Sequence, residues 1–341
     1  MIKKDKILII QTAFLGDVIL ALPIVQTLKK HLPDSKIDFL CIPNTVGVLE
    51  NHPDINQSIP YDKKGGDKLD KFIEILSEIR EVEYDTVISP HRSFRSAMLT
   101  YYSEAHVKTG FNRNALSFLL TNKVKYVQNK HEIYRNLELV KAVLGNDYDE
   151  DKISLKPNLY PSNKDVNFVN HLFNRSNLVT FAPCSRWFTK QLTIDKSKQV
   201  IDILISDGYN IALIGGESDE IYCCELEKQI DDDSLINLAG KLTPLQSYTV
   251  ITKSKALITV DSAAQHLGAA SNTPIILIYG STNSSFGFYP LTSKHSIVEN
   301  KVLNCRPCTD HGRDKCPLKH FKCIEDLTAE QIVAELRKIK A

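Results

Sequence analysis

The stretch from residue 255 to residue 280, KALITVDSAAQHLGAASNTPIILIYG, constrains the fold more than any other part of the chain. Two short apolar runs, residues 256–260 and 275–279, flank a small-residue segment of helical length, residues 263–270. A turn containing proline, residues 272–274, precedes the second run. This order predicts a strand, a helix and a parallel strand, which is the repeating unit of an α/β sheet.

Asp261 and Ser262 stand between the first strand and the helix, where Ala263, Ala264 and His266 follow. Both suit an N-cap, since their side-chain oxygens can accept from the first free backbone N–H groups. The other free N–H groups and the positive end of the helix dipole favour a bound phosphate. In a doubly wound sheet such a turn lies where ligands bind, so we expect a phosphorylated ligand.

The length and composition of the chain are those of a globular protein with two domains. The chain has 341 residues, 43% of them hydrophobic and 24% charged, which is enough for two soluble domains. Its 42 basic and 41 acidic residues give a net charge of +1, so bulk attraction to nucleic acid or anionic lipid is not expected. No apolar run approaches the roughly 20 residues that span a bilayer, and we expect a cytoplasmic protein.

Each half of the chain repeats the strand and helix alternation. In the first half, the expected strands are 6–10, 37–41 and 86–89, and the expected helices are 17–32, 68–80 and one that opens within residues 91–99. In the second half, the expected strands before residue 255 are 178–181, 210–214 and 235–238, and the expected helices are 194–206, 217–230 and 244–253. Residues 146–164, rich in Asp, Asn, Pro and Lys, read as the linker between two α/β domains.

The last expected helix covers residues 328–340. Its apolar residues Ile332, Val333, Leu336 and Ile339 recur at helical spacing. We therefore expect this helix to pack on a domain rather than to extend into solvent.

The loop TAFLGD joins the first strand to the first helix and contains Thr12, Gly16 and Asp17. It matches neither the GxGxxG fingerprint nor a P-loop. Glycine allows a tight turn, and the helix dipole favours a carboxylate in the first turn. Asp17 is then either an ordinary N-terminal helix carboxylate or a general base held ionised in the ligand crevice.

His91, Arg92 and Arg95 follow the third expected strand. The arginines suit a phosphate or carboxylate of a ligand, and the alternative is a set of solvated surface charges. Residues 110–125 mix basic side chains with aromatic ones such as Phe118. We interpret this stretch as an excursion that could dock an acidic, amphiphilic partner.

Two further loops of the second half follow strands. FAPCSRWFTK offers Ser185 and Lys190 to a phosphate, and a lysine there can neutralise a pyrophosphate without a metal. In IGGESDE, Gly216 permits close approach of the backbone to a ligand, and Glu217 can accept from a hydroxyl.

The eight cysteines are expected to be reduced thiols or metal ligands, because no export signal accompanies them. Cys305, Cys308, Cys316 and Cys323, with His311 and His320 nearby, form a knuckle-like ligand set for a structural zinc or iron, although the spacing is not that of a standard finger. The alternative is unliganded packing. The Asp-x-Asp run at residues 231–233 reads as a solvated turn, so no catalytic metal is expected there.

The ordered set TAFLGDVILALP, FAPCSRWFTKQL, LIGGESDE and TVDSAAQHLGAASNTPIILIYGST resembles the bacterial lipopolysaccharide heptosyltransferases of glycosyltransferase family 9. The terminal CRPCTDHGRDKCPLKHFKC is similar to the heptosyltransferase II branch. The resemblance implies an α/β fold of GT-B type, with two facing Rossmann-like domains and the active site in the interdomain cleft. It implies an acceptor-side domain at 1–160, a nucleotide-sugar-binding domain at 161–325 and a C-terminal helix at 326–341.

The resemblance also implies inverting transfer of L-glycero-D-manno-heptose from ADP-heptose to the inner core on lipid A. Asp17 would accept the proton of the acceptor hydroxyl, and Lys190 would face the donor phosphates. Asp261, Ser262 and the helix after them would bind the donor, although Ala263 stands where the family usually has glycine. No cofactor is implied for catalysis, and the lipid acceptor implies peripheral contact with the inner face of the inner membrane.

Two other functions fit the same residues. The first is transfer of a different sugar from another nucleotide donor, because loops that bind a diphosphate do not specify the base or the sugar. The second is a non-catalytic nucleotide-sugar-binding protein of envelope assembly, which the alanine at residue 263 makes conceivable.

Overall fold

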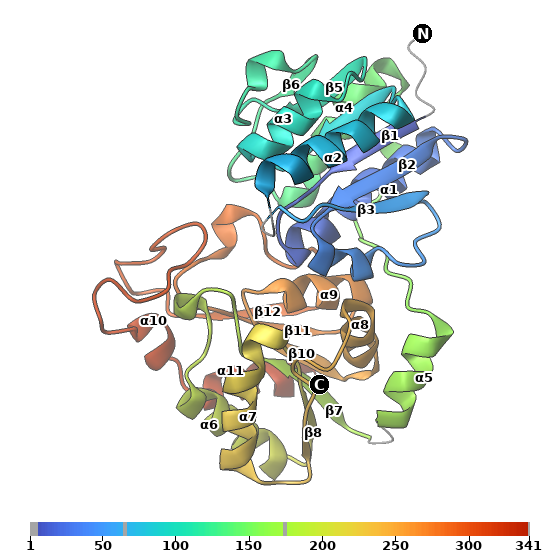
Figure 1. The fold of residues 1–341 in the computed structure, drawn as a ribbon. Coiled ribbons are helices and arrows are strands. Elements are labelled where there is room, and N and C mark those ends of the chain that lie inside the picture. Colours follow the sequence, from blue (N-terminus) through green and yellow to red (C-terminus); the bar gives the residue numbers. More distant parts are fainter. Residues whose placement is uncertain (1–5, 64–66, 173–175, 340–341) are drawn as a thin grey trace. The chain divides into compact units, whose positions relative to one another are not determined.

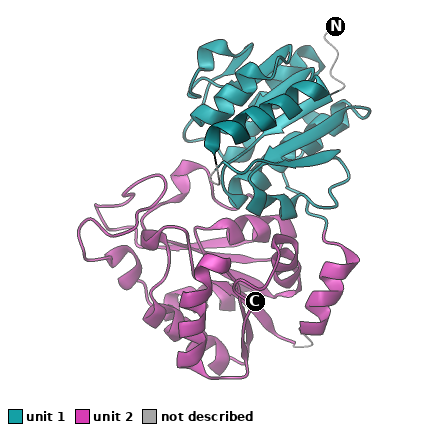
Figure 2. Ribbon diagram, viewed as in Figure 1, with its two compact units in different colours: residues 1–160 teal, residues 161–341 magenta. Residues whose placement is uncertain are grey.

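The computed structural model describes residues 6–63, 67–172 and 176–339 and divides the chain into two compact units. Unit 1 is Met1–Tyr160 and unit 2 is Pro161–Ala341 (Figure 2). The boundary falls inside the stretch 146–164 that composition singled out as a linker. Each unit has its own sheet and core, and the two are described separately.

In its described residues, unit 1 contains a parallel sheet of six strands in the order β3-β2-β1-β4-β5-β6. The strands are β1 Lys6–Ile10, β2 Lys36–Cys41, β3 Gln57–Pro60, β4 Thr86–Ser89, β5 Val107–Phe111 and β6 Asn122–Val124. The central strand β1 is a continuous apolar run because helices cover both faces of the sheet. Each of its four buried aliphatic side chains contributes about 1.5–3 kcal/mol to folding.

In its described residues unit 1 has four α-helices (Figure 1): α1 Leu15–His31, α2 Lys68–Val82 and α3 Phe94–Tyr102, which connect strands, and α4 Glu132–Leu144, which follows the last strand. Helix α1 packs on α4, whereas α2 buries Ile75 and Ile79 in a core it shares with β1 and β4. The α2 helix begins where the Asp67 carboxylate accepts from the backbone N–H of Leu69, which is an N-cap.

Unit 2 repeats this topology with the order β12-β11-β10-β7-β8-β9, again in parallel, in its described residues. The strands are β7 Leu178–Ala182, β8 Asn210–Leu213, β9 Leu235–Asn237, β10 Ala256–Val260, β11 Ile275–Tyr279 and β12 His295–Glu299. In both sheets the first and fourth strands of the unit are neighbours, and the chain reverses its winding between them. This is the topology of a Rossmann fold.

The helices of unit 2 are α5 Asn163–Leu172, α6 Ile194–Ser206, α7 Glu220–Ile230, α8 Pro244–Lys253, α9 Ala263–Ser271, α10 Lys322–Glu325 and α11 Ala329–Ile339. Helices α6, α7 and α11 contribute to one hydrophobic core against the sheet. The terminal helix α11 packs on α6 and buries Ile332, Val333 and Leu336. Lys340, the predicted end of this helix, lies outside the described residues.

Most long helices and eight strands were predicted from the sequence, including the short strands β4, β8 and β9, whereas other elements were missed. The expected βαβ unit is present as β10, α9 and β11, and the helices at 194–206 and 244–253 have the predicted ends. Strands β3, β5, β6 and β12 and helices α4 and α5 were missed. The interpretation of 110–125 as an excursion is wrong in part, because its two ends belong to β5 and β6. No helix in the described residues is long and apolar enough to cross a membrane.

Candidate active site

The predicted residues of unit 1 gather at the point where its sheet reverses winding. Thr12, Gly16 and Asp17 follow β1, and Arg92 and Arg95 follow the neighbouring strand β4. Since the strands are parallel, both loops leave the same edge of the sheet, where open α/β sheets bind ligands.

Asp17 is the third residue of α1 and is half-buried. Its carboxylate accepts a hydrogen bond from the backbone N–H of Phe14, at 3.2 Å. The positive end of the helix dipole also favours the ionised carboxylate there. Gly16 is buried beside it in the first turn. Asp17 therefore lies in the first turn of α1 with its carboxylate bonded to a backbone N–H and its side chain partly exposed.

Thr12 belongs to a polar cluster that joins the β1 loop to the β4 loop. Its hydroxyl lies 2.9 Å from Nδ1 of His91 and 3.2 Å from Oγ of Ser96. The Lys63 ammonium donates to the Thr12 carbonyl at 2.6 Å. Burial, with the nearby charges of Lys63 and Arg92, lowers the pKa of His91 to about 4, so its imidazole is neutral at pH 7. The sequence grouped His91 with the arginines but did not indicate Ser96 or Lys63.

The two predicted arginines have different environments. The Arg92 guanidinium is exposed and lies over the ring of Tyr126, 4.2 Å from its centroid. Arg95 donates from Nη1 to the carbonyl of Lys63, at 2.6 Å, and so holds the loop after β3. Arg92 is thus the better placed of the two for a ligand anion.

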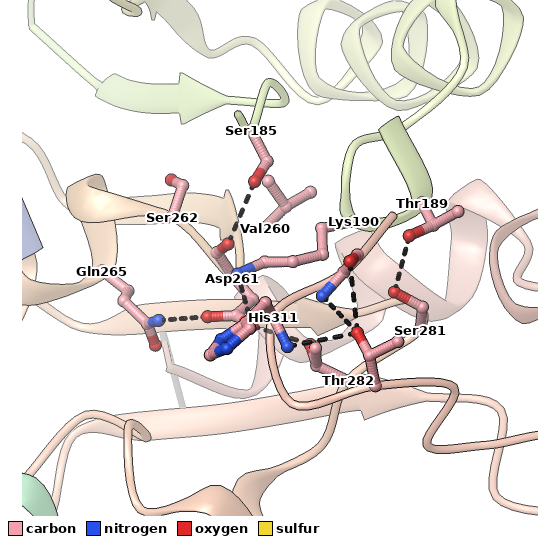
Figure 3. A network of polar contacts seen from close by, with 12 residues as sticks. Ser185, Thr189, Lys190, Val260, Asp261, Ser262, Gln265, Ser281, Thr282 and His311 are labelled. Carbon is pink, nitrogen blue, oxygen red and sulfur yellow. Dashed lines mark hydrogen bonds and ion pairs between the residues drawn. The ribbon is translucent and has the colours of Figure 1, made fainter. Parts of the chain in front are cut away.

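In unit 2 the sheet reverses its winding between β7 and β10, and we call such a position a switch point. A buried ion pair lies there (Figure 3). Nζ of Lys190 lies 2.9 Å from Oδ2 of Asp261, and their side chains are only 14% and 12% exposed. Lys190 ends a short 3₁₀ turn in the loop after β7, and Asp261 follows β10 directly. The sequence listed both residues but did not indicate that they contact each other.

Asp261 has two further partners. Its Oδ2 accepts from the Thr282 hydroxyl at 2.7 Å, and its Oδ1 accepts from Nε2 of Gln265 at 2.8 Å. Burial alone would raise the pKa of this carboxyl. The Lys190 charge, the hydrogen bonds from Lys190 and Thr282, and His266 outweigh burial and hold the pKa below its ordinary value. Asp261 is therefore an ionised anchor for Lys190.

The turn into α9 differs from the prediction in one respect. Ser262 is the N-cap of α9, yet its side chain makes no capping hydrogen bond, and the Asp261 carboxylate is directed to Lys190 instead. Ala263 and Ala264 form the first helical residues and are half-buried, whereas His266 is buried. Ala263 has no positive φ, so the alanine fits where the family usually has glycine.

The remaining predicted loops lie beside a hollow of about 850 Å³ in unit 2. Ser185, which donates to the Asp261 carbonyl at 3.3 Å, is among its lining residues, as is Asp219. Gly216 and Glu217 are exposed, and the Gly216 N–H donates to the Asp219 carboxylate at 2.9 Å. The Gly216 N–H is therefore already bonded within its own loop, and the close approach of its backbone to a ligand stays a prediction.

The four cysteines of the predicted metal knuckle lie after β12, and the last of them, Cys323, is inside α10. Within the part of the chain that the structure describes, which includes all of 305–323, no three His, Cys, Asp or Glu side chains are arranged to hold a metal ion. Cys308 donates its thiol to the Cys305 carbonyl at 3.2 Å. Cys323 is packed in the core, where burial raises its pKa to about 12. The four cysteines lie near enough to one another for the neighbouring thiols to act on the pKa of Cys308 and of Cys323, so the ligand set of Cys305, Cys308, Cys316 and Cys323 stays a prediction.

Two Rossmann-like units, with a carboxylate at one switch point and a lysine beside a helix N-terminus at the other, define a glycosyltransferase of GT-B type. The chain belongs to glycosyltransferase family 9 (heptosyltransferase), whose model matches residues 73–320.

Similar proteins cover almost the whole chain. Lipopolysaccharide heptosyltransferase 3 of Escherichia coli K12 is 28% identical over 95% of this chain and 95% of its own. Lipopolysaccharide heptosyltransferase 2 of the same strain is 25% identical over 86% and 87%. The solved structure of E. coli ADP-heptose lps heptosyltransferase II shares the fold, with a TM-score of 0.80 and 22% identity over 98% of both chains.

Proposed function

We propose that this protein transfers L-glycero-D-manno-heptose from ADP-heptose to the inner core of lipopolysaccharide, with inversion at the anomeric carbon. Two relatives that cover 95% and 86% of this chain are named lipopolysaccharide heptosyltransferase 3 and lipopolysaccharide heptosyltransferase 2. The observation that carries the proposal is that different chemical groups lie where the two sheets reverse their winding. Unit 1 supplies an accessible carboxylate, Asp17, and unit 2 supplies a held lysine, Lys190.

Asp17 acts as the general base on the acceptor. It takes the proton of the attacking hydroxyl while the hydroxyl oxygen forms its bond to the anomeric carbon of heptose. The bond from that carbon to the diphosphate oxygen breaks, and ADP leaves with the electron pair. A single displacement of this kind inverts the anomeric configuration. Proton transfer to a positioned carboxylate typically contributes about 10²–10⁴ to the rate.

Lys190 and the N-terminus of α9 stabilise the leaving diphosphate. The lysine provides a positive charge, and the first N–H groups of α9, beginning at Ala263, provide donors that need no reorganisation during reaction. Asp261 keeps Lys190 in place by a direct ion pair. Because this cation and the helix N-terminus offset the developing charge, we propose that transfer requires no catalytic metal.

Arg92 binds an anionic group of the acceptor. Its guanidinium is exposed and supported on the face of Tyr126, which leaves its donors available to a phosphate or carboxylate. Thr12 and Arg95 keep the surrounding loops in position through His91 and Lys63.

A lipid-linked acceptor places the reaction at the cytoplasmic face of the inner membrane, with the protein as a peripheral partner. Lys123 and Lys125, exposed on and beside β6, are basic groups of unit 1 that suit anionic headgroups.

The test is calorimetric titration with ADP-heptose, ADP, UDP and GDP, each with and without a chelator. Selective binding of the two adenine ligands that survives chelation supports the proposal. Transfer to a heptose-deficient lipopolysaccharide core, with the anomeric configuration of the product read by NMR, then establishes the reaction. Preference for UDP or GDP would move the donor to another nucleotide sugar, and binding of none would favour a non-catalytic protein.

A further inference from the structure

A turn at residues 309–313, within the cysteine-bearing segment, is joined directly to the loop that carries Lys190. The backbone N–H of Thr189 donates to the carbonyl of Arg313 at 3.0 Å. In return, the backbone N–H of Arg313 donates to the hydroxyl of Thr189 at 2.8 Å. Two segments far apart in the sequence are therefore paired immediately beside Lys190.

Gly312 is the residue of this turn that touches the lysine. A Cβ atom built on Gly312 would lie 2.8 Å from Cδ and 3.0 Å from Cγ of Lys190, and 2.7 Å from Cβ of Trp187. Its φ of +99° is also one that side-chain-bearing residues rarely adopt. The bare backbone of Gly312 thus packs against the aliphatic part of Lys190.

The turn is itself held in place on both sides. The Thr309 hydroxyl accepts from the N–H of Gly312 at 2.7 Å and closes the turn. The hydroxyls of Thr189 and Ser281 lie 2.9 Å apart (Figure 3), and the N–H of Ser281 donates to the Thr189 carbonyl at 3.1 Å. The N–H of Cys308 donates to the carbonyl of Ser281 at 2.9 Å, which ties the start of the turn to the same strand end.

Lys190 is consequently fixed at both ends of its side chain. The turn at 309–313 limits its methylene stem, and Asp261 binds its ammonium at 2.9 Å. A free lysine has many rotamers and must lose that freedom when it binds an anion. A lysine held in advance presents its charge at a defined position, which is what stabilisation of a leaving group requires.

We propose that Gly312 and Thr189 are positioning residues for the donor-binding lysine. They act through Lys190 and touch no substrate group. The cysteine-bearing segment then serves the reaction by supporting the phosphate-binding loop. This inference rests on the proposed role of Lys190 at the donor diphosphate.

The first test compares Gly312→Ala with Gly208→Ala. Gly208 lies in the same unit and also has a positive φ, +77°, but a Cβ there meets no atom within 4 Å. It controls for backbone strain alone. We expect Gly312→Ala to weaken ADP binding, measured by calorimetry, about tenfold more than Gly208→Ala, the size expected when a charged hydrogen-bond donor is displaced. Equal ADP affinities in the two variants would overturn the inference.

Combination with Lys190→Ala separates positioning from general structural damage. If Gly312 acts through Lys190, then Gly312→Ala should cause no further loss of ADP affinity once the lysine is absent. If Gly312→Ala lowered ADP affinity as much in the Lys190→Ala background as in the wild type, the turn would act on ADP binding without Lys190. Unchanged ADP binding by Lys190→Ala alone would show that the lysine does not bind the donor, which contradicts the proposed function. Weaker ADP binding by Lys190→Ala, combined with normal binding by Gly312→Ala, would contradict only this inference.

Thr189→Val and Thr189→Ser provide a second route that does not strain the backbone. Valine removes the acceptor of the Arg313 N–H, whereas serine retains it. We expect valine to raise the KM for the donor and serine to restore it, with the KM for the acceptor unchanged in both. A valine variant that folds and keeps the wild-type donor KM would contradict the proposal.

Discussion

One aspartate lies near the reversal of winding in each sheet, and the two have different surroundings. Asp17 follows the first strand of unit 1, and Asp261 follows the fourth strand of unit 2, each at the reversal of its sheet. Asp17 is half-buried and accepts from a backbone N–H. Asp261 is buried, and a lysine, a threonine and a glutamine are bonded to it. The reversal of winding thus presents a half-buried carboxylate in unit 1, for which we propose the role of base, and a carboxylate paired with Lys190 in unit 2.

The largest expected effect is a loss of transfer rate when the carboxylate of Asp17 is removed. Asp17→Asn should lower the rate of heptosyl transfer about 10²–10⁴-fold, because amide nitrogen and oxygen cannot take the acceptor proton. Affinity for ADP should remain close to that of the wild type. Rates come from release of ADP and affinity from calorimetry, with Asp17→Glu as the control that keeps a carboxylate. An Asp17→Asn variant with most of its activity would show that Asp17 is not the base.

The sequence predicted the positions of the loops better than the contacts made within them. A strand followed by small or polar residues is a local pattern, so Asp17, Lys190 and Asp261 were all singled out as candidates. The ion pair between Lys190 and Asp261 joins loops about 70 residues apart and has no local signal. The contact of Gly312 with Lys190 was likewise invisible, because the glycine lies in a segment that cysteine spacing assigned to a metal.

The second prediction concerns the stability of the anchor. Asp261→Asn leaves the Lys190 ammonium without its carboxylate in a largely buried site, and the cost of breaking such a pair is about 3 kcal/mol. Urea unfolding should show this loss together with weaker ADP binding. The matched control is Asp202→Asn, which breaks the exposed Lys198–Asp202 pair and should cost less than about 0.5 kcal/mol. Equal losses in the two variants would mean that Asp261 is not an anchor.

Lowering the pH should destabilise unit 1 before unit 2. Burial lowers the pKa of His52 and His91 in unit 1 from 6.5 to about 4. Both histidines are therefore neutral when folded and bind protons more readily when unfolded. Their contribution to stability is complete above pH 6.5 and is lost as the pH falls toward 4. The pKa of Asp261 in unit 2 lies below 3.8, so its contribution is lost only at more acidic pH.

Hydrogen exchange at pH 7 and pH 5 measures this difference by unit. The strands of unit 1 should lose protection at pH 5 before those of unit 2. His52→Asn should reduce the change in unit 1, since one of the two titrating histidines is removed. Earlier loss in unit 2 would contradict the assignment of the acid-sensitive groups to unit 1.

The smallest effect tests whether membrane contact belongs to unit 1 alone. Lys123 and Lys125 are exposed, and basic residues near an anionic surface contribute about 1 kcal/mol each. Charge reversal at both should therefore lower co-sedimentation with phosphatidylserine vesicles and leave ADP affinity unchanged. Lys253 and Lys255 are exposed in unit 2 with the same spacing, so their reversal is a matched control for net charge. Equal loss of vesicle binding in both variants would mean that binding depends only on the net charge of the protein, and not on a surface of unit 1.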